Sequence, residues 1–143
     1  MRKVLVTGST GFVGSNLTRA LLDKGFSVRC LVRKTSDTVN IDDLDVDVVY
    51  GDITDKGSVS RALEGCEGLF HTAAHYKLWV ADPDIMYKVN VEGTKNVMNA
   101  ALEKKLKRVV YTSSVATLRA SEHKEVADET SEPVPSEIIS HYK

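Results

Sequence analysis

The chain has 143 residues, of which 42% are hydrophobic, and its 19 basic and 20 acidic residues give a net charge of −1 at neutral pH. This length suits a single domain with one core, and the balanced charge gives no reason to expect a nucleic-acid partner. The longest apolar runs are far shorter than the roughly 20 residues that span a bilayer, so we expect no membrane association.

The N-terminus and the cysteines indicate a cytoplasmic protein. Met1, Arg2 and Lys3 run directly into a predicted strand, which argues against a signal peptide. Cys30 and Cys66 have neither metal-site nor redox-motif spacing, so we expect reduced core thiols and no bound metal.

The first predicted elements are a buried strand over residues 4–6, a glycine-rich turn and a helix that ends at Gly25. The apolar stripe of this helix consists of Val13, Leu17, Ala20 and Leu21. A glycine turn lets the backbone approach a phosphate closely, and the first N–H groups and the dipole of the helix hold the anion. The pattern predicts a dinucleotide-binding loop made of Gly8, Ser9, Thr10, Gly11, Phe12, Val13 and Gly14.

The second predicted strand spans residues 27–32 and is followed by Arg33 and Lys34. An acidic residue here would bind the ribose hydroxyls of NAD, whereas a guanidinium suits a 2′-phosphate. We therefore predict NADP as the cofactor, with NAD as the alternative. The competing interpretation is that both residues are solvated surface charges.

A third strand is predicted over residues 44–50 and is closed by a turn that contains Asp52 and Ile53. Thr54 is the predicted cap of a short helix that Gly65 ends. This turn is either a plain Gly-Asp turn or part of the nucleotide site.

The fourth and fifth strands are predicted over residues 68–72 and 107–112, with a long helix over residues 84–104 between them. Gly93 on the apolar stripe of this helix would allow a close approach to the sheet. Ala73 and Ala74 follow the fourth strand, where small side chains leave room for a ligand. Alternating strands and helices predict an α/β fold with a doubly wound parallel sheet, a Rossmann fold.

The character of the chain changes after Leu118. Residues 119–136 are polar and are predicted to form a long loop, and residues 137–143 to begin a helix. We interpret residues 1–143 as one truncated domain whose later strands and substrate lobe are absent. Apolar surface around Val109 and Tyr111 should then be uncovered, and a homo-oligomer is possible.

Three motifs together resemble one enzyme family. They are T-G-x-x-G-x-x-G from Thr7, N-x-x-G-T-x-N from Asn90 and the Thr-Ser-Ser run that ends at Ser114. These resemble the extended short-chain dehydrogenase/reductases of the NAD-dependent epimerase/dehydratase superfamily. Residues 71–79 and 109–118 narrow the resemblance to dihydroflavonol-4-reductase-like proteins, including the hopanoid-associated sugar epimerase group.

The resemblance implies roles for particular residues. Ser114 would hydrogen-bond the substrate carbonyl, and Tyr142 would be the tyrosine of a Y-x-x-x-K pair whose lysine lies beyond Lys143. Asn90 would have a structural role, bridging helix and strand. The implied cofactor contacts are Asp52 and Ile53 at the adenine, together with Ala73, Ala74, His75, Thr112 and Ser113.

The expected function is the NADP-dependent reduction of a ketone in a small-molecule substrate. The alternatives are an NAD-dependent sugar-nucleotide epimerase or dehydratase and a non-catalytic cofactor-binding module. A lysine four residues after Tyr142 would favour an enzyme. Without that lysine, we expect residues 1–143 alone to be inactive.

Overall fold

The computed structural model describes residues 2–76, 82, 84–118 and 126–131. The predicted helix start over 137–143, with Tyr142, lies outside these residues, as does most of the predicted loop over 119–136. The elements are β1 (Lys3–Thr7), α1 (Phe12–Asp23), β2 (Ser27–Val32), β3 (Asp47–Tyr50), α2 (Lys56–Ala62), β4 (Gly68–His71), α3 (Asp84–Tyr87), a π-helical segment (Lys88–Gly93), α4 (Thr94–Glu103), β5 (Arg108–Tyr111) and a 3₁₀ turn (Val115–Thr117). No helix in the described ranges is both long enough and apolar enough to cross a bilayer.

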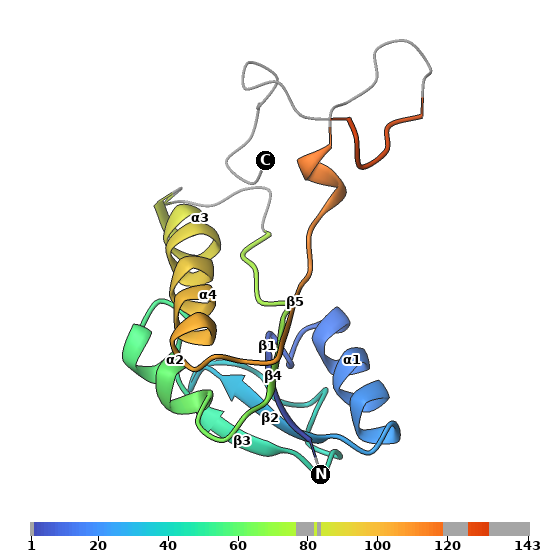
Figure 1. The fold of residues 1–143 in the computed structure, drawn as a ribbon, viewed down its shortest axis with the longest axis vertical. Coiled ribbons are helices and arrows are strands. Elements are labelled where there is room, and N and C mark those ends of the chain that lie inside the picture. The colour runs from blue at the N-terminus through green and yellow to red at the C-terminus, as the bar shows by residue number, and fades with distance from the viewer. Residues whose placement is uncertain (1, 77–81, 83, 119–125, 132–143) are drawn as a thin grey trace.

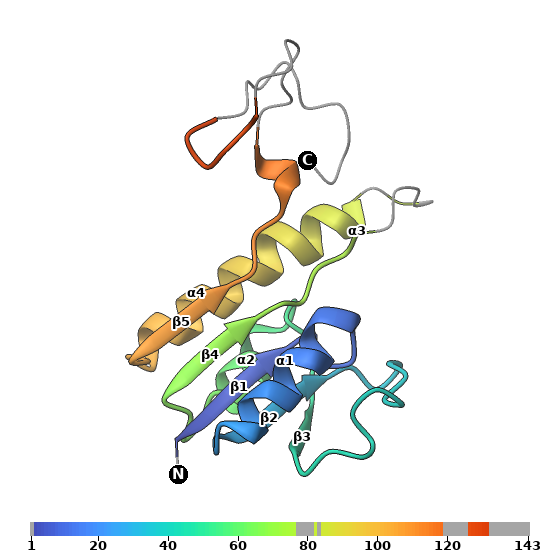
Figure 2. The ribbon, with the colours of Figure 1, turned by 90° about the vertical axis from the view of Figure 1, so that its right-hand side faces the viewer.

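The five strands form one parallel sheet in the order β3-β2-β1-β4-β5 (Figures 1 and 2). The chain moves outward from β1 in one direction, then crosses β1 to place β4 and β5 on its other side. This arrangement confirms the predicted Rossmann-type α/β fold. It also creates the topological switch point, next to β1, at which such sheets bind ligands.

Each face of the sheet packs against a different layer. Leu5, Leu31 and Leu69 point to one face, where they pack against residues of α2 and α4. Val6 and Cys30 belong to the other face, whose core includes Leu21 of α1. Figure 2 shows α1 and the α2–α4 pair on opposite sides of the strands. Successive side chains of β1 point to opposite faces of the sheet, and both faces are covered, so all residues from Val4 to Thr7 are buried.

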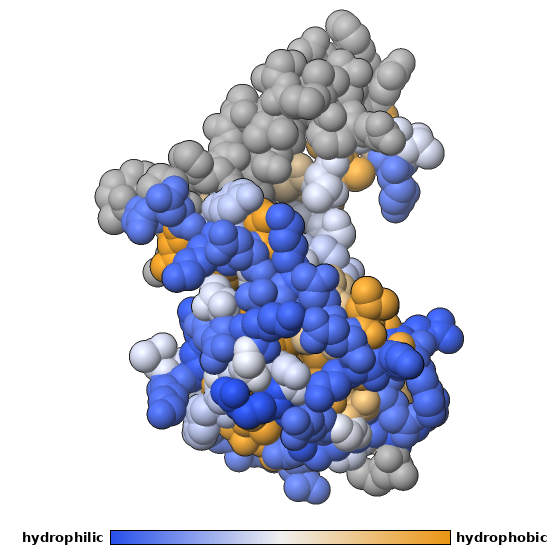
Figure 3. Space-filling model, turned by 60° about the vertical axis from the view of Figure 1, so that its left-hand side comes forward, coloured by the Kyte–Doolittle hydropathy of each residue, from blue (hydrophilic) through white to orange (hydrophobic). Residues whose placement is uncertain are grey.

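The outer side of the α2–α4 layer faces solvent. In Figure 3, which brings forward the side that carries these helices in Figure 1, the described surface is mostly hydrophilic, with apolar residues in separate small patches.

Helix α1 buries a face that only partly matches the predicted one. Its buried residues are Gly14, Ser15, Thr18 and Leu21, whereas Val13 is 55% exposed and Ala20 is also exposed. The polar groups on this face are satisfied within the helix, since the Thr18 hydroxyl donates to the Gly14 carbonyl at 2.8 Å. Small side chains therefore face the sheet, and the apolar-stripe prediction was wrong for two of its four members.

The start of the third strand and the cap of α2 also differ from the prediction, and the ends of β1, β4 and β5 differ by one residue. The third strand begins at Asp47, because Leu44 and Val46 lie in turns and pack with the core on the α1 side. The cap of α2 is Asp55, whose carboxylate accepts the Gly57 N–H. The Thr54 hydroxyl donates instead to Asp52, so its prediction as the cap was wrong.

The long predicted helix over 84–104 is present but is not uniformly α-helical. Residues Lys88–Gly93 form a π-helical stretch between α3 and α4. Gly93 is closely packed, since a Cβ there would lie 2.8 Å from the Cγ1 of Ile53. The close approach is therefore confirmed, but its partner is the loop after β3.

Strand β5 is the least covered part of the sheet. All four of its residues are exposed, including Val110 at 43% and Tyr111 at 53%. This confirms the predicted uncovered surface beside β5.

Candidate active site

The loops that follow the five strands meet at one edge of the sheet, because parallel strands end at the same side. Two contacts join the glycine loop to its neighbours. The backbone of Gly8 lies directly against Ala73, which follows β4, and the Asn40 amide donates to the Thr10 carbonyl at 2.9 Å. The segments after β1, β2 and β4 are therefore in contact.

Glycine is required at two places in the loop. Gly8 has a φ of +74°, and a Cβ there would lie 2.7 Å from the Ala73 nitrogen. A Cβ at Gly14 would collide with the Gly8 carbonyl. A Cβ at Gly11 would have only the Gly8 oxygen within reach, at 3.4 Å, so this exposed position is free on its outer side.

The N-terminus of α1 has no side-chain cap. Its N-cap is Gly11, and its first turn contains no acidic residue. Helix α2 differs, since the Asp55 carboxylate caps it. The first N–H groups of α1 therefore keep the capacity to bind an anion. Phe12 and Val13 are exposed beside them, and Ser9 is fully buried, with a hydroxyl that has no partner among the described residues.

The loop after β2 exposes its basic residues. Arg33 and Lys34 follow Val32 directly and are both exposed. The Asn40 contact brings the remainder of this loop to the glycine loop. Cofactor selection by Arg33 and Lys34 stays a prediction.

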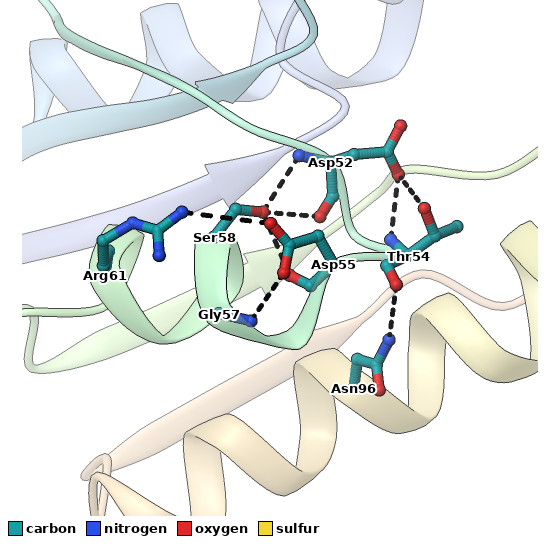
Figure 4. Close-up of polar contacts among 7 residues, drawn as sticks. All are labelled: Asp52, Thr54, Asp55, Gly57, Ser58, Arg61 and Asn96. Atoms are coloured by element: carbon teal, nitrogen blue, oxygen red, sulfur yellow. Dashed lines mark hydrogen bonds and ion pairs between the residues drawn. The ribbon is translucent and has the colours of Figure 1, made fainter.

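The loop after β3 holds Asp52 half-buried. One carboxylate oxygen accepts both the N–H and the hydroxyl of Thr54, each at 2.8 Å. The other oxygen makes no hydrogen bond within the described residues (Figure 4). Ile53 is 7% exposed and packs in the core.

A pocket of about 160 Å3 lies between the segments that follow β4 and β5. It brings together five of the predicted site residues: Ala73, Ala74, Thr112, Ser113 and Ser114. Asn90 and Thr94 also line it. Among the described residues, no group of three or more His, Cys, Asp or Glu side chains is placed to hold a metal ion.

Among the described residues, no group accepts a hydrogen bond from the Ser114 hydroxyl. Its Oγ accepts the Ala116 N–H at 3.2 Å, which caps the 3₁₀ turn. An acceptor contact of this kind leaves the hydroxyl hydrogen available, so Ser114 can donate to an oxygen in the pocket.

A buried histidine connects three parts of the site. One ring nitrogen of His71 lies 2.6 Å from the Thr7 hydroxyl, and the other lies 3.1 Å from the Thr94 hydroxyl. The ring also stacks on Tyr111, with centroids 5.2 Å apart. Burial lowers the pKa of His71 to about 4, so the ring is neutral at pH 7. The neutral ring has one donor and one acceptor nitrogen, which suits two hydroxyl partners.

The sequence singled out His71 only as a residue unsuited to zinc. The signal that was available is a polar residue at the last position of an apolar strand.

The side-chain amide of Asn90 makes two hydrogen bonds with the backbone of the segment after β4. Its Nδ2 donates to the His75 carbonyl at 2.8 Å, and its Oδ1 accepts the His75 N–H at 2.7 Å. The expected bridge between helix and strand end is confirmed.

Comparison with known proteins gives consistent results. The model of the NAD dependent epimerase/dehydratase family matches residues 4–143. The chain is 45% identical over 138 residues to a putative dihydroflavonol 4-reductase of Synechocystis sp., covering 96% of this chain and 40% of that protein. It is 46% identical over 110 residues to sterol demethylase protein B of Methylococcus capsulatus, covering 77% and 34%. The chain thus spans about two fifths or less of these relatives.

Solved structures are similar as well. The crystal structure of gox2253 superposes with a TM-score of 0.92 at 46% identity, over 99% of this chain and 43% of that one. The UDP-glucose 4-epimerase of Thermus thermophilus, solved in complex with NAD, gives 0.83 at 31% identity, over 98% and 46%. With the parallel sheet, the glycine loop and a family model matched from residue 4 to residue 143, the chain belongs to the NAD dependent epimerase/dehydratase family.

Proposed function

We propose that this chain is the dinucleotide-binding part of an NADP-dependent oxidoreductase that reduces a ketone in a small molecule. The observation that carries the proposal is the uncapped N-terminus of α1 behind Gly8 and Gly14, where a Cβ has no space. Such a terminus binds phosphate through backbone N–H groups and the helix dipole. The dinucleotide's pyrophosphate would lie there, outside Gly11.

The choice of NADP is supported by the residues after β2. Arg33 and Lys34 are exposed at the carboxyl end of the strand, where a ribose 2′-phosphate would lie beside two cations. Asp52 would accept from the adenine amino group with the oxygen that Thr54 does not use, and Ile53 would pack beside the base.

The pocket supports the chemistry of a carbonyl substrate. The bound nicotinamide would supply the hydride. Ser114 would donate a hydrogen bond to the carbonyl oxygen and keep its own proton, and Tyr142 would transfer the one proton that this oxygen takes up as the hydride reaches the carbon. Ala73, Ala74 and His75 would flank the nicotinamide, with Thr112 and Ser113 across the pocket. Asn90 and His71 would hold the walls of this pocket in place through their hydrogen bonds.

A titration tests the cofactor assignment. NADPH should bind the chain more tightly than NADH, and Arg33→Ala should weaken NADPH binding by about 1–3 kcal/mol, the scale of a lost charged hydrogen bond. Binding of NADH should stay nearly unchanged. The matched control is Arg61→Ala on α2, whose guanidinium lies 3.9 Å from the Asp55 carboxylate and is exposed. Equal losses for both cofactors would refute the role of Arg33.

A second candidate function is an NAD-dependent sugar-nucleotide epimerase. The similarity to the NAD-bound UDP-glucose 4-epimerase favours it. Tighter binding of NAD than of NADP, together with binding of UDP-sugars, would support this candidate against the reductase. Cofactor binding without turnover in any longer protein that contains this chain would instead favour a non-catalytic module.

A further inference from the structure

The loop over residues 51–55 is shaped by contacts within itself and with Ser58 of α2. The Asp52 carboxylate holds Thr54, and the Asp55 N–H donates to the Asp52 carbonyl at 3.0 Å. The Ser58 hydroxyl accepts the Asp52 N–H at 3.0 Å and lies 2.7 Å from the Asp52 carbonyl, to which it donates. These bonds fix the form of the turn, but they do not fix its position relative to β4 and the pocket.

Contacts from α4 and the residue before it tie the loop to the side of the molecule that carries β4 and the pocket. The Asn96 side-chain nitrogen donates to the Thr54 carbonyl at 3.3 Å (Figure 4). It also donates to the Ile53 carbonyl at 3.1 Å, and both contacts join residues more than forty positions apart in the sequence. One turn earlier, Gly93 lies against the Ile53 side chain so closely that a Cβ would not fit. Residues three apart share a helix face, so one face of the helix holds the loop through a donor and a steric contact.

The same helical segment also contacts the end of β4 and the segment that follows it. Thr94 contacts His71 at the end of β4, and Asn90 holds His75 just beyond it. Asn96 therefore relates the loop after β3 to the pocket through a single rigid element. A ligand that reaches from the loop after β3 to the pocket would therefore have its two ends held in a fixed relation to each other.

We propose that Asn96 is a positioning residue for the adenine end of the cofactor. By fixing the Ile53 and Thr54 carbonyls, it holds the Asp52 carboxylate so that the oxygen left free by Thr54 meets the base. This inference rests on the proposed function, since it assumes that Asp52 accepts from the adenine amino group.

The test compares NADPH with its hypoxanthine analogue, which lacks that amino group. The wild-type chain should bind NADPH about tenfold more tightly than the analogue, the scale of one hydrogen bond to a charged acceptor. In Asn96→Ala the preference should fall to about two- to threefold. A general loss of stability would weaken the binding of both ligands equally and leave the ratio of their two affinities unchanged.

The controls are on the same helix. Asn99 is exposed on α4 and makes no side-chain hydrogen bond within the described residues, so Asn99→Ala repeats the chemical change and should keep the tenfold preference. Asn96→Ser, which retains a shorter donor, should give an intermediate ratio and serves if the alanine variant does not fold. Amide hydrogen exchange at Thr54 should be faster in Asn96→Ala than in Asn99→Ala.

The outcomes separate the two proposals. If the wild-type chain binds neither nucleotide, the proposed function fails and the inference fails with it. If the wild type discriminates and Asn96→Ala discriminates equally well, the inference alone is refuted. A wild type that binds both nucleotides equally refutes the role of Asp52 and hence that of Asn96, while dinucleotide binding stands.

Discussion

The neutral state of His71 makes the stability of the fold depend on pH. The ring is fully buried between two threonine hydroxyls, and its pKa falls from an ordinary 6.5 to about 4. The unfolded chain takes up a proton near pH 6.5, whereas the folded chain resists it until about pH 4. The stabilisation of the folded state by neutral His71 is therefore fully present above pH 6.5 and is lost as the pH falls from 6.5 towards 4.

The magnitude follows from that difference. Each pKa unit corresponds to about 1.4 kcal/mol, so lowering the pH from 7.5 to 5 should reduce the unfolding free energy by about 2 kcal/mol. For a domain of this size we expect a fall in Tm of about 6–8 °C. The carboxylate of Asp47 titrates below this window, because hydrogen bonds from Lys3 and Arg29 hold its pKa below the ordinary 3.8.

The assay is chemical denaturation of the wild type and of His71→Asn at several pH values. The variant should be less stable at pH 7.5 but should lose this part of the pH dependence. An NMR titration of the wild-type ring provides a direct measurement. A His71 titration midpoint near 6.5, or equal slopes in the two proteins, would refute the reasoning.

Two further predictions concern the glycine loop and the edge strand. Gly11→Ala should fold with near wild-type stability but lose dinucleotide binding, because its methyl group would occupy the anion site. Gly14→Ala should be clearly destabilised, because its methyl group would collide with the Gly8 carbonyl. Thermal melts and cofactor titrations of both variants check these expectations. The 143-residue chain should self-associate through the exposed β5, and Val110→Lys should weaken that association in sedimentation experiments; a wild-type chain that stays monomeric with a sharp melt at high temperature would contradict it.

The parallel strands and the glycine loop were predictable because strong local signals specify them. The apolar run of β1 and the turn at Gly8, where φ is positive, are predictable from the local sequence, since each depends on the backbone preferences of its own residues. The inward face of α1 was not readable, because a helix that lies close to a sheet selects small residues such as Gly14 and Thr18 over large apolar ones. Steric fit outweighed hydrophobicity there.

Contacts between distant segments account for the remaining differences. Nothing near His71 in the sequence shows that Thr7 and Thr94 will meet its two nitrogens. Thr54 does not cap α2, because its N–H and its hydroxyl both donate to the Asp52 carboxylate. The Asp55 carboxylate accepts the Gly57 N–H and caps the helix instead. The pocket residues after β4 and β5 were predictable in kind, because parallel strands deliver their carboxyl ends to one edge.

The central place of β1 has a consequence for how the chain folds during synthesis. Thr7 of β1 pairs with Leu31 of β2, but its partner on the other side, His71, lies 64 residues away. Until β4 has left the ribosome, the backbone N–H and C=O groups along one edge of β1 have no strand partner. The side chain of Leu5 also lacks the packing that Leu69 of β4 supplies. Such non-local pairing slows folding and prolongs the exposure of sticky surface. We therefore expect the first stable nascent unit to form only when the chain has grown past β4.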